Sequence, residues 1–334
     1  MIDLRSDTIT KPTPAMREFM MKAEVGDDVM EEDPSINALQ EKAAGLLGRE
    51  AALFVPSGTM ANTLAIKVLT HPGDEIILAD GSHPFMFEGA APSIICAVQT
   101  RVLPAPRGLL EPDQILPAIR PHDIHHPPTS LITLENTHNR GGGTVYPLAT
   151  VAAIREVADR HSLSVHMDGA RLLNACAATG HKPAEYARYA HTVCFCLSKG
   201  LGAPVGSLLV GDRATISQAR RWRKMLGGGM RQAGFLAAAG IYALDHHVER
   251  LSEDHNLAKT LARGLARMDG LELDPEAVET NIVIFSINRQ ELTAATLADR
   301  LKNHGILVQV IGHRQIRAVT HLDVDRDDID LTIK

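Results

Sequence analysis

Residues 195–211, FCLSKGLGAPVGSLLVG, place one lysine between two apolar runs. Residues 195–197 are typical of the end of a buried strand, and residues 208–210 of the core of the next one. Lys199 lies between them in a segment rich in glycine. A lysine held at a strand end by apolar neighbours loses hydration, and its free amine becomes a nucleophile that can form a Schiff base.

The composition bounds the class of protein. The chain has 334 residues, of which 45% are hydrophobic and 22% charged, as in ordinary globular proteins. A formal charge of −6 argues against nucleic-acid binding, which needs a basic face. We find neither a membrane span nor the apolar core of a signal peptide. We expect a cytoplasmic protein with reduced, buried thiols at Cys96, Cys176, Cys194 and Cys196.

Short apolar segments alternate with helical patterns over most of the chain. AALFV at 51–55 and EIILAD at 75–80 are typical strands, and residues 147–161 form an amphipathic helical pattern. This alternation predicts an α/β fold with a mainly parallel sheet covered by helices on both faces. We predict a large domain at 1–240, with an N-terminal arm at 1–20, and a smaller C-terminal α/β domain at 241–334.

The common nucleotide-binding signatures are absent. The chain contains no GxxxxGK[ST] motif, so a P-loop would lack its lysine and its hydroxyl. GLGAPVG at 200–206 is one residue longer than the dinucleotide fingerprint. A nicotinamide-dependent dehydrogenase is therefore disfavoured.

A different phosphate cradle fits residues 54–69. A short strand leads through Ser57, Gly58 and Thr59 into an amphipathic helix. Backbone N–H groups at a helix start, with two hydroxyls beside them, can hold a phosphate. An ordinary helix cap at Ser57 or Thr59 explains the same residues.

A carboxylate and a guanidinium follow another apolar strand, in VHMDGAR. Asp168 lies at the carboxyl end of that strand, where open α/β sheets bind their ligands. Arg171 lies three residues further on, and a buried Asp168–Arg171 pair that holds the loop is an equally good interpretation. Together, the phosphate cradle, Asp168 and Lys199 match what pyridoxal 5'-phosphate requires: a phosphate site, an acid for the ring nitrogen and an amine for the aldehyde.

Motifs along nearly the whole chain resemble those of the low-specificity L-threonine aldolases, a family of fold-type I pyridoxal-phosphate enzymes. They include MIDLRSDTITKPT, EAALFVPSGTMAN, LENTHNRGGG, HMDGARLLNA and KMLGGGMRQAGFLAAAGIYAL. The resemblance implies a carbon–carbon lyase that cleaves L-threonine and L-allo-threonine to glycine and an aldehyde. The nearest alternatives with the same cofactor are a β-eliminating lyase and an aminotransferase.

The resemblance also implies roles for single residues. Lys199 would carry the cofactor aldehyde, Asp168 would bind the pyridine nitrogen, and His83 would stack on the ring and exchange protons. The remaining cofactor and substrate residues are the phosphate loop Ser57, Gly58 and Thr59, the carboxylate clamp Ser6, Arg171 and Arg317, and a second histidine, His125, with His126 beside it as the weaker candidate.

Two basic residues, Lys224 and Arg231, flank MLGGGM and are similar to family residues that reach the cofactor of a neighbouring subunit. The resemblance therefore implies a homo-oligomer, with a dimer as the catalytic unit and a tetramer as the assembly. Its role would lie in threonine breakdown and glycine formation.

Three features leave open questions. Met30 and Glu31 stand where the family has tyrosine and glycine, which could alter substrate fit or loop geometry. NRGGGT at 139–144 is either a flexible loop or part of the site. HDIHH at 122–126 is rich in histidine, but it lies in a proline-rich loop with no nearby thiolate or cluster of acids, so we expect no metal site.

Overall fold

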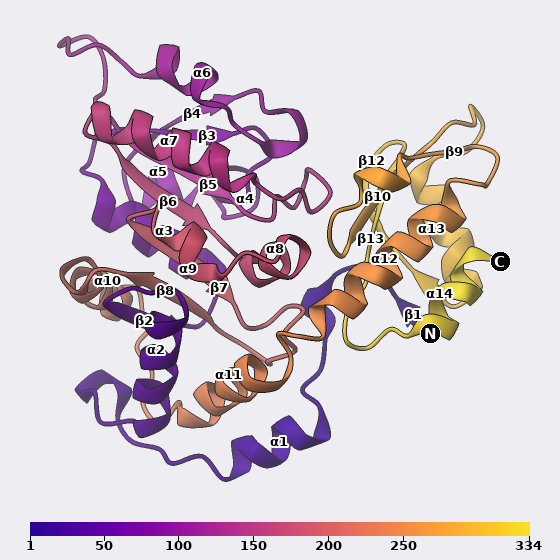
Figure 1. The fold of residues 1–334 in the computed structure, drawn as a ribbon, viewed down its shortest axis with the longest axis horizontal. Helices are drawn as coiled ribbons and strands as arrows, with labels where there is room; N and C mark the ends of the chain where they lie inside the picture. The colour runs from indigo at the N-terminus through magenta and orange to yellow at the C-terminus, as the bar shows by residue number, and fades with distance from the viewer.

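The computed structural model describes residues 1–334 as a larger and a smaller body (Figure 1). The larger body contains a seven-stranded sheet with the order β2-β8-β7-β6-β5-β3-β4. Strand β8 is antiparallel to both of its neighbours and the other pairs are parallel, which confirms a mainly parallel sheet. The strands are β2 Ala51–Val55, β3 Glu75–Ala79, β4 Gln99–Leu103, β5 Thr129–Glu135, β6 Ser164–Asp168, β7 Thr192–Cys196 and β8 Ser207–Gly211.

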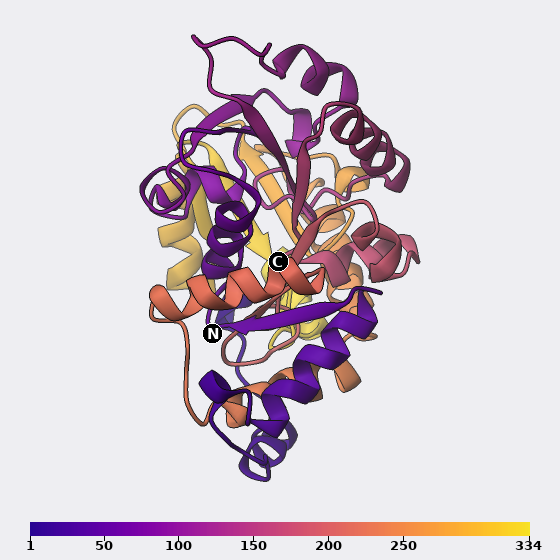
Figure 2. The same ribbon diagram turned by 90° about the vertical axis from the view of Figure 1, so that its left-hand side faces the viewer.

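Helices cover both faces of this sheet. Successive residues of a strand point to opposite faces, so they belong to two different apolar clusters. Cys194 and Leu209 pack with the helices α3 and α10, whereas Phe195 and Leu208 belong to the main core. Figure 2 shows the edge strand β2 in front and the yellow smaller body behind. The helices of this body are α1 Pro14–Met21, α2 Pro34–Leu46, α3 Gly58–Leu69, α4 His83–Met86, α5 Ala91–Ile94, α6 Pro112–Ile115, α7 Leu148–Arg160, α8 Leu172–Thr179, α9 Pro183–Ala187, α10 Arg213–Met225 and α11 Gly234–His246.

The smaller body is an antiparallel sheet of four strands with helices against it. Its order is β12-β13-β10-β9, and Figure 1 shows the long helix α12 running beside it. Its strands and helices are β9 Leu271–Glu272, β10 Ile282–Ile287, β12 Gln309–Gly312, β13 Gln315–Val319, α12 Leu251–Leu265, α13 Ala294–Asn303 and α14 Arg326–Ile333. Short 3-10 helices lie at Asp7–Ile9, Asp28–Met30, Pro106–Gly108, Leu116–Ala118 and Pro275–Ala277.

The N-terminal arm connects the two bodies. Strand β1, Ile2–Asp3, pairs in parallel with β11, Ile306–Leu307. Leu4 is completely buried in the apolar cluster of the smaller body, whereas the following helix α1 packs on α11 of the larger one. The division of the chain near residue 240 stays a prediction.

Two further expectations concern the cysteines and the helices. All four cysteines are free thiols; three are buried and Cys176 is half-buried. None of the helices has both the length and the apolar character that a membrane crossing requires.

The glycine-rich loop at 139–144 is packed between the two bodies. Thr280 donates a hydrogen bond to the carbonyl of Gly143 at 2.8 Å, and Glu279 accepts one from the backbone N–H of Val145 at 3.1 Å. Glu279 also forms an ion pair with Arg107 at 2.7 Å. The loop therefore joins the two bodies, and its residues Asn139 and Arg140 line a pocket of about 460 Å³.

Gly143 allows the closest approach in this joint. Its φ is +75°, and a Cβ placed on it would lie 2.3 Å from the Thr280 hydroxyl oxygen. We expect Gly143→Ala to lower the free energy of unfolding by at least about 2 kcal/mol, since strain and a steric clash add. Urea denaturation would measure this loss. Gly180→Ala is the matched control, because Gly180 has a φ of +77° but no atom within 4 Å; equal losses in the two variants would contradict the clash.

Candidate active site

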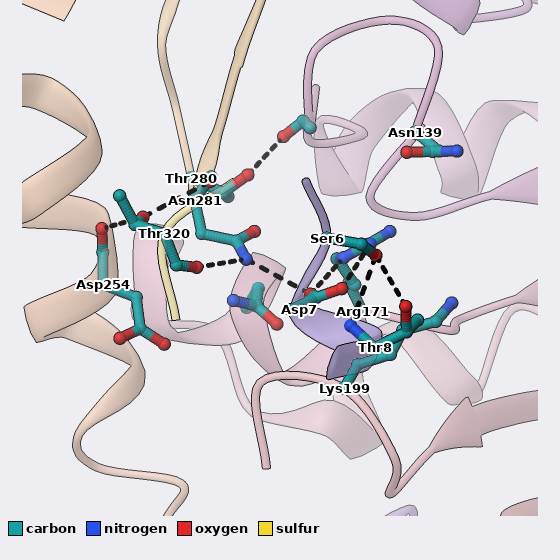
Figure 3. Close-up of polar contacts among 12 residues, drawn as sticks. Ser6, Asp7, Thr8, Asn139, Arg171, Lys199, Asp254, Thr280, Asn281 and Thr320 are labelled. Carbon is teal, nitrogen blue, oxygen red and sulfur yellow. Dashed lines mark hydrogen bonds and ion pairs between the residues drawn. The ribbon is translucent and has the colours of Figure 1, made fainter. Parts of the chain in front are cut away.

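One pocket of about 460 Å³ opens where the arm and both bodies meet. It brings together five of the residues that the sequence singled out, from positions 6 to 317, and Figure 3 shows three of them. Its lining is Ser6, Thr8, His83, Phe87, Asn139, Arg140, Arg171, Lys199, Gln309, Val310, Ile311 and Arg317.

Asp168 is the last residue of β6, and Lys199 follows the neighbouring strand β7; the two strands are parallel and end at the same edge of the sheet. The backbone at Lys199 is held by the arm, because the Thr10 hydroxyl donates to the Lys199 carbonyl at 2.9 Å. Asp168 is buried and accepts hydrogen bonds from the Asn62 amide at 2.7 Å and the Ala170 N–H at 3.0 Å. Burial disfavours the charged form, but His83, Lys199 and Asn62 outweigh it and lower the pKa of Asp168. Asp168 is therefore an ionised carboxylate close to the amine.

The predicted phosphate loop caps a helix. Ser57 precedes α3, and its hydroxyl accepts a hydrogen bond from the backbone N–H of Met60 at 3.1 Å. A Cβ on Gly58 would lie 2.9 Å from the Cys196 sulfur, so a larger residue does not fit without movement. Ser57 and Thr59 also line a second cavity of about 330 Å³. The ordinary cap is thus present, and phosphate binding by this loop stays a prediction.

His83 begins α4 and is held at two points. Its backbone N–H donates to Glu135 at 2.7 Å, and its Nδ1 lies 2.7 Å from Glu88 Oε1. Burial lowers the pKa of this imidazole, but the Glu88 hydrogen bond and the charge of Asp168 raise it more, so the net shift is upward. His83 therefore binds a proton more tightly than a free imidazole does.

Arg171 has a partner that the sequence did not indicate. Its Nε and Nη2 donate to the two carboxylate oxygens of Asp7, each at 2.7 Å, and both side chains are buried (Figure 3). Burial opposes ionisation of Asp7, but the Arg171 guanidinium holds the pKa of that carboxyl far below its ordinary value. The Asp168–Arg171 pair considered above is therefore not the one that forms.

Arg317, on β13, is a half-buried guanidinium with no carboxylate partner. Its Nη1 donates to Asn139 Oδ1 at 2.6 Å, its Nη2 donates to the Arg5 carbonyl at 3.1 Å, and its buried Nε has no partner. Burial and the nearby Arg171 lower its pKa to about 10, so the guanidinium is still charged at neutral pH. A positive charge that faces a pocket without an acid can bind a small anion such as a carboxylate.

Besides Asp168 and the phosphate loop, three further predicted residues do not line this pocket. His125 is exposed, in a loop before β5, and its Nδ1 pairs with Asp123 at 2.6 Å. Lys224 is exposed near the end of α10, and Arg231 pairs with Asp27 at 2.7 Å. None of the three lines the pocket of its own chain.

The two departures from the family pattern lie on the surface. Met30 is 65% exposed, and Glu31 adopts a left-handed conformation with a φ of +64°, which a glycine would adopt more easily. The Glu31 carboxylate pairs with Arg220, an interaction that no glycine could make.

Two polar residues were missed by the sequence analysis. The amide nitrogen of Asn62, on α3, donates to both Glu88 and Asp168, each at 2.7 Å. The signals were an asparagine on the apolar face of a helix and an acid five residues after His83. Side-chain atoms of His83, Glu88 and Asp168 lie within 4.8 Å of one another, which is close enough to share one metal ion. The Asn62 N–H groups face the two carboxylates, however, so hydrogen bonds already hold these residues together.

A mainly parallel sheet with a lysine and an acid at neighbouring strand ends defines the fold-type I class of pyridoxal-phosphate enzymes. Solved structures agree on this fold: the threonine aldolase of Leishmania major superposes with a TM-score of 0.86 at 21% identity, covering 100% of this chain and 98% of that one. The serine palmitoyltransferase of Sphingomonas wittichii superposes with a TM-score of 0.77 at 17% identity, covering 99% and 85%.

Sequence comparison identifies the family. Residues 3–288 match the beta-eliminating lyase family. The chain is 44% identical over 330 residues to the low specificity L-threonine aldolase of Escherichia coli (strain K12), covering 98% of this chain and 96% of the relative. It is 42% identical to low-specificity L-threonine aldolase 1 of Arabidopsis thaliana, covering 99% and 94%. The chain thus belongs to the beta-eliminating lyase family and, within it, to the low-specificity L-threonine aldolases, which confirms the resemblance.

The buried His166 beneath this site makes stability depend on pH. Its side chain is fully buried, and burial lowers its pKa to about 4. Between about pH 6.5 and 4 the unfolded chain binds a proton that the folded chain does not, so stability falls as the pH falls through this window. We expect a loss of up to about 3 kcal/mol from His166, measured as the free energy of unfolding against pH.

The variant His166→Asn would test the assignment through the slope of that curve. We expect a shallower slope between pH 6.5 and 4, whatever the absolute stability of the variant. His255→Gln is the positive control outside the site. Burial also lowers the pKa of His255 to about 4, so this variant should reduce the slope by a similar amount. A slope unchanged by His166→Asn would show that His166 does not titrate in this window.

Proposed function

We propose that this chain is a pyridoxal-5'-phosphate-dependent aldolase that cleaves L-threonine and L-allo-threonine to glycine and an aldehyde. The observation that carries the proposal is one pocket lined by the amine of Lys199, the imidazole of His83 and the carboxylate-free guanidinium of Arg317. The similarity to curated L-threonine aldolases over nearly the whole chain supports the same activity. The free thiols favour a cytoplasmic setting, where the enzyme would break down threonine and form glycine.

The donor set fits the cofactor. Lys199 offers an amine for the aldehyde, Asp168 an ionised carboxylate for the pyridine nitrogen, and Ser57, Gly58 and Thr59 the start of α3 for the phosphate. When bound, the cofactor supplies an electron sink that stabilises negative charge at the substrate Cα.

The substrate carboxylate would bind mainly to Arg317. Two of the three nitrogens of the Arg171 guanidinium already bind Asp7, which leaves only its Nη1 for a ligand. Ser6 lies in the same pocket and adds a hydroxyl. Fixing the carboxylate orients the Cα–Cβ bond, which is the geometric requirement for breaking that bond rather than another one at Cα.

His83 would accept the proton of the substrate β-hydroxyl as the Cα–Cβ bond breaks. Its Nδ1 already contacts Glu88, so Nε2 is the nitrogen available to a ligand. His125 is the alternative base, but its exposed loop lies outside the pocket of its own chain. It could act only in the site of a neighbouring copy.

Lys199→Ala tests the proposal directly. We expect the wild type to release glycine and acetaldehyde from L-threonine, and the variant to lose both this turnover and the visible absorption band of the bound cofactor. Lys67→Ala is the control, because Lys67 stacks over Trp222 away from the pocket and should leave both signals in place. A Lys199→Ala variant that kept the band and the turnover would remove Lys199 from this role.

The name of the matched family favours one second candidate, β-elimination. Incubation with L-serine and L-threonine separates the reactions, because elimination releases ammonia and a keto acid whereas the aldolase releases glycine and an aldehyde. Ammonia without glycine would replace the aldolase proposal.

We also propose that two copies of the chain form the catalytic unit, with a tetramer as the assembly. Lys224 and Arg231 lie outside their own pocket, and large apolar side chains are exposed near them and near the phosphate loop. These are Met30, Phe85, Met86, Ile94, Met225 and Phe235. In a dimer, Lys224 and Arg231 would reach the site of the partner.

Mixing two inactive variants tests this arrangement. Refolding Lys199→Ala together with Lys224→Ala should restore roughly a quarter of the wild-type activity, since half of the dimers are hybrids and each hybrid holds one complete site. Activity of each variant alone is the baseline. A mixture that forms hybrids by mass spectrometry but stays at the baseline would show that Lys224 acts within its own chain.

A further inference from the structure

Glu88 is a fully buried carboxylate beside the half-exposed His83. Its side chain has no exposed surface, whereas that of His83 is 31% exposed. Glu88 Oε1 accepts a hydrogen bond from the Asn62 amide at 2.7 Å and lies 2.7 Å from His83 Nδ1. Its Oε2 is buried without a partner. A buried carboxylate costs free energy unless charged or polar groups compensate it, so this residue requires an explanation beyond packing.

The neighbours of Asn62 fix the direction of its amide. Asn62 Oδ1 lies 3.0 Å from His166 Nε2 and 3.1 Å from the Cys194 thiol, and both of these groups can donate to an oxygen. The opposite ring nitrogen of His166, Nδ1, lies 2.8 Å from the Thr192 hydroxyl and 3.2 Å from the Thr192 carbonyl. An ionised carboxylate such as Asp168 can only accept, so the Asn62 nitrogen faces Glu88 and Asp168. Glu88 thus has a fixed position between an amide and an imidazole.

We propose that Glu88 is the positioning residue that holds the Nδ1–H of His83, so that the unprotonated Nε2 faces the pocket. This inference rests on the proposed function only for the step that it serves, which is removal of the substrate hydroxyl proton at Nε2. With Nδ1 bound to Glu88, only one nitrogen of the ring can meet a ligand. The same contact stabilises the imidazolium that forms when Nε2 takes up that proton.

The charges around His83 agree with this role. Glu88, Asp168 and Glu135 lie on its acidic side, and together with the Glu88 hydrogen bond they raise the pKa of the imidazole against the effect of burial. The basic groups that line the same pocket are Arg140, Arg171, Lys199 and Arg317. Burial raises the pKa of the Glu88 carboxyl as well, although the hydrogen bonds from His83 and Asn62 act in the opposite direction.

Nuclear magnetic resonance of histidine labelled with ¹⁵N tests the proposal on the protein without added cofactor or substrate. The His83 signal is assigned by its loss in His83→Phe. Above its titration midpoint we expect Nδ1 to carry the proton and Nε2 to be unprotonated. The reverse pattern in the wild type would overturn the proposal, and this measurement needs no variant at Glu88.

Glu88→Gln keeps the shape of the side chain and removes its charge. We expect the His83 midpoint to fall by at least about one pH unit, which is a tenfold change in the ratio of its two protonation states. Glu135→Gln is the matched control, because Glu135 is also a buried acid near His83 but contacts only its backbone N–H. Its effect on the midpoint should be clearly smaller, and equal shifts would show that charge alone, without the ring contact, governs His83.

Kinetics then connect this geometry to the reaction. With L-threonine, Glu88→Gln should lower kcat at least tenfold, change KM less than about threefold, and move the acidic limb of the pH profile with the measured midpoint. Glu88→Asp should recover part of the loss. A Glu88→Gln variant with the shifted His83 midpoint but an unchanged kcat would show that Glu88 does not serve catalysis. A wild type that makes no glycine from L-threonine would overturn the proposed function. The test of the His83 proton would stand in that case, because it does not depend on turnover.

Discussion

The buried ion pair between Asp7 and Arg171 is the interaction on which the rest of the site depends. Asp7 comes from the arm, Arg171 from the segment after β6, and the Asn281 amide of the smaller body donates to the same carboxylate at 3.2 Å (Figure 3). Three parts of the chain thus meet at one carboxylate. Loss of one partner of such a buried pair costs about 3–5 kcal/mol in proteins generally, because the other charge is left uncompensated. The same contact places Ser6 and Thr8 beside Lys199.

Two polar arrays extend from this point. On one side, Arg317 is held by Asn139 and the Arg5 carbonyl, which are neutral groups, so that its charge is left for a ligand. On the other side, the Asn62 amide lies between two carboxylates and joins the acid at the end of β6 to the imidazole at the start of α4. In the proposed reaction, the first array would bind the substrate anion and the second would position the group that takes up its proton.

The sequence predicted the residues that follow strands and missed those that act through other residues. Lys199 and Asp168 could be found because each one follows an apolar strand, and parallel strands end at one edge. The partner of Arg171 could not, since Asp7 is 164 positions away. Asn62 lies in a helix whose pattern indicates only packing, and nothing in the sequence shows that its amide meets two acids. Glu135 likewise serves by accepting two backbone N–H groups, from His83 and Asn139, a role without a sequence signature.

The pairing of β1 with β11 has a consequence for biosynthesis. Ile2 lies opposite Ile306, and the Leu4 carbonyl accepts a hydrogen bond from Val319. Residues 2–4 must therefore wait for the synthesis of residues 306–319 before they find these neighbours. Until then the wall that carries Ser6 and Thr8 cannot close over the strand ends, even if the seven-stranded sheet has already folded. A complete wall around this pocket thus requires synthesis through β11, and a nascent chain that stops before β11 would leave Lys199 in an open cleft.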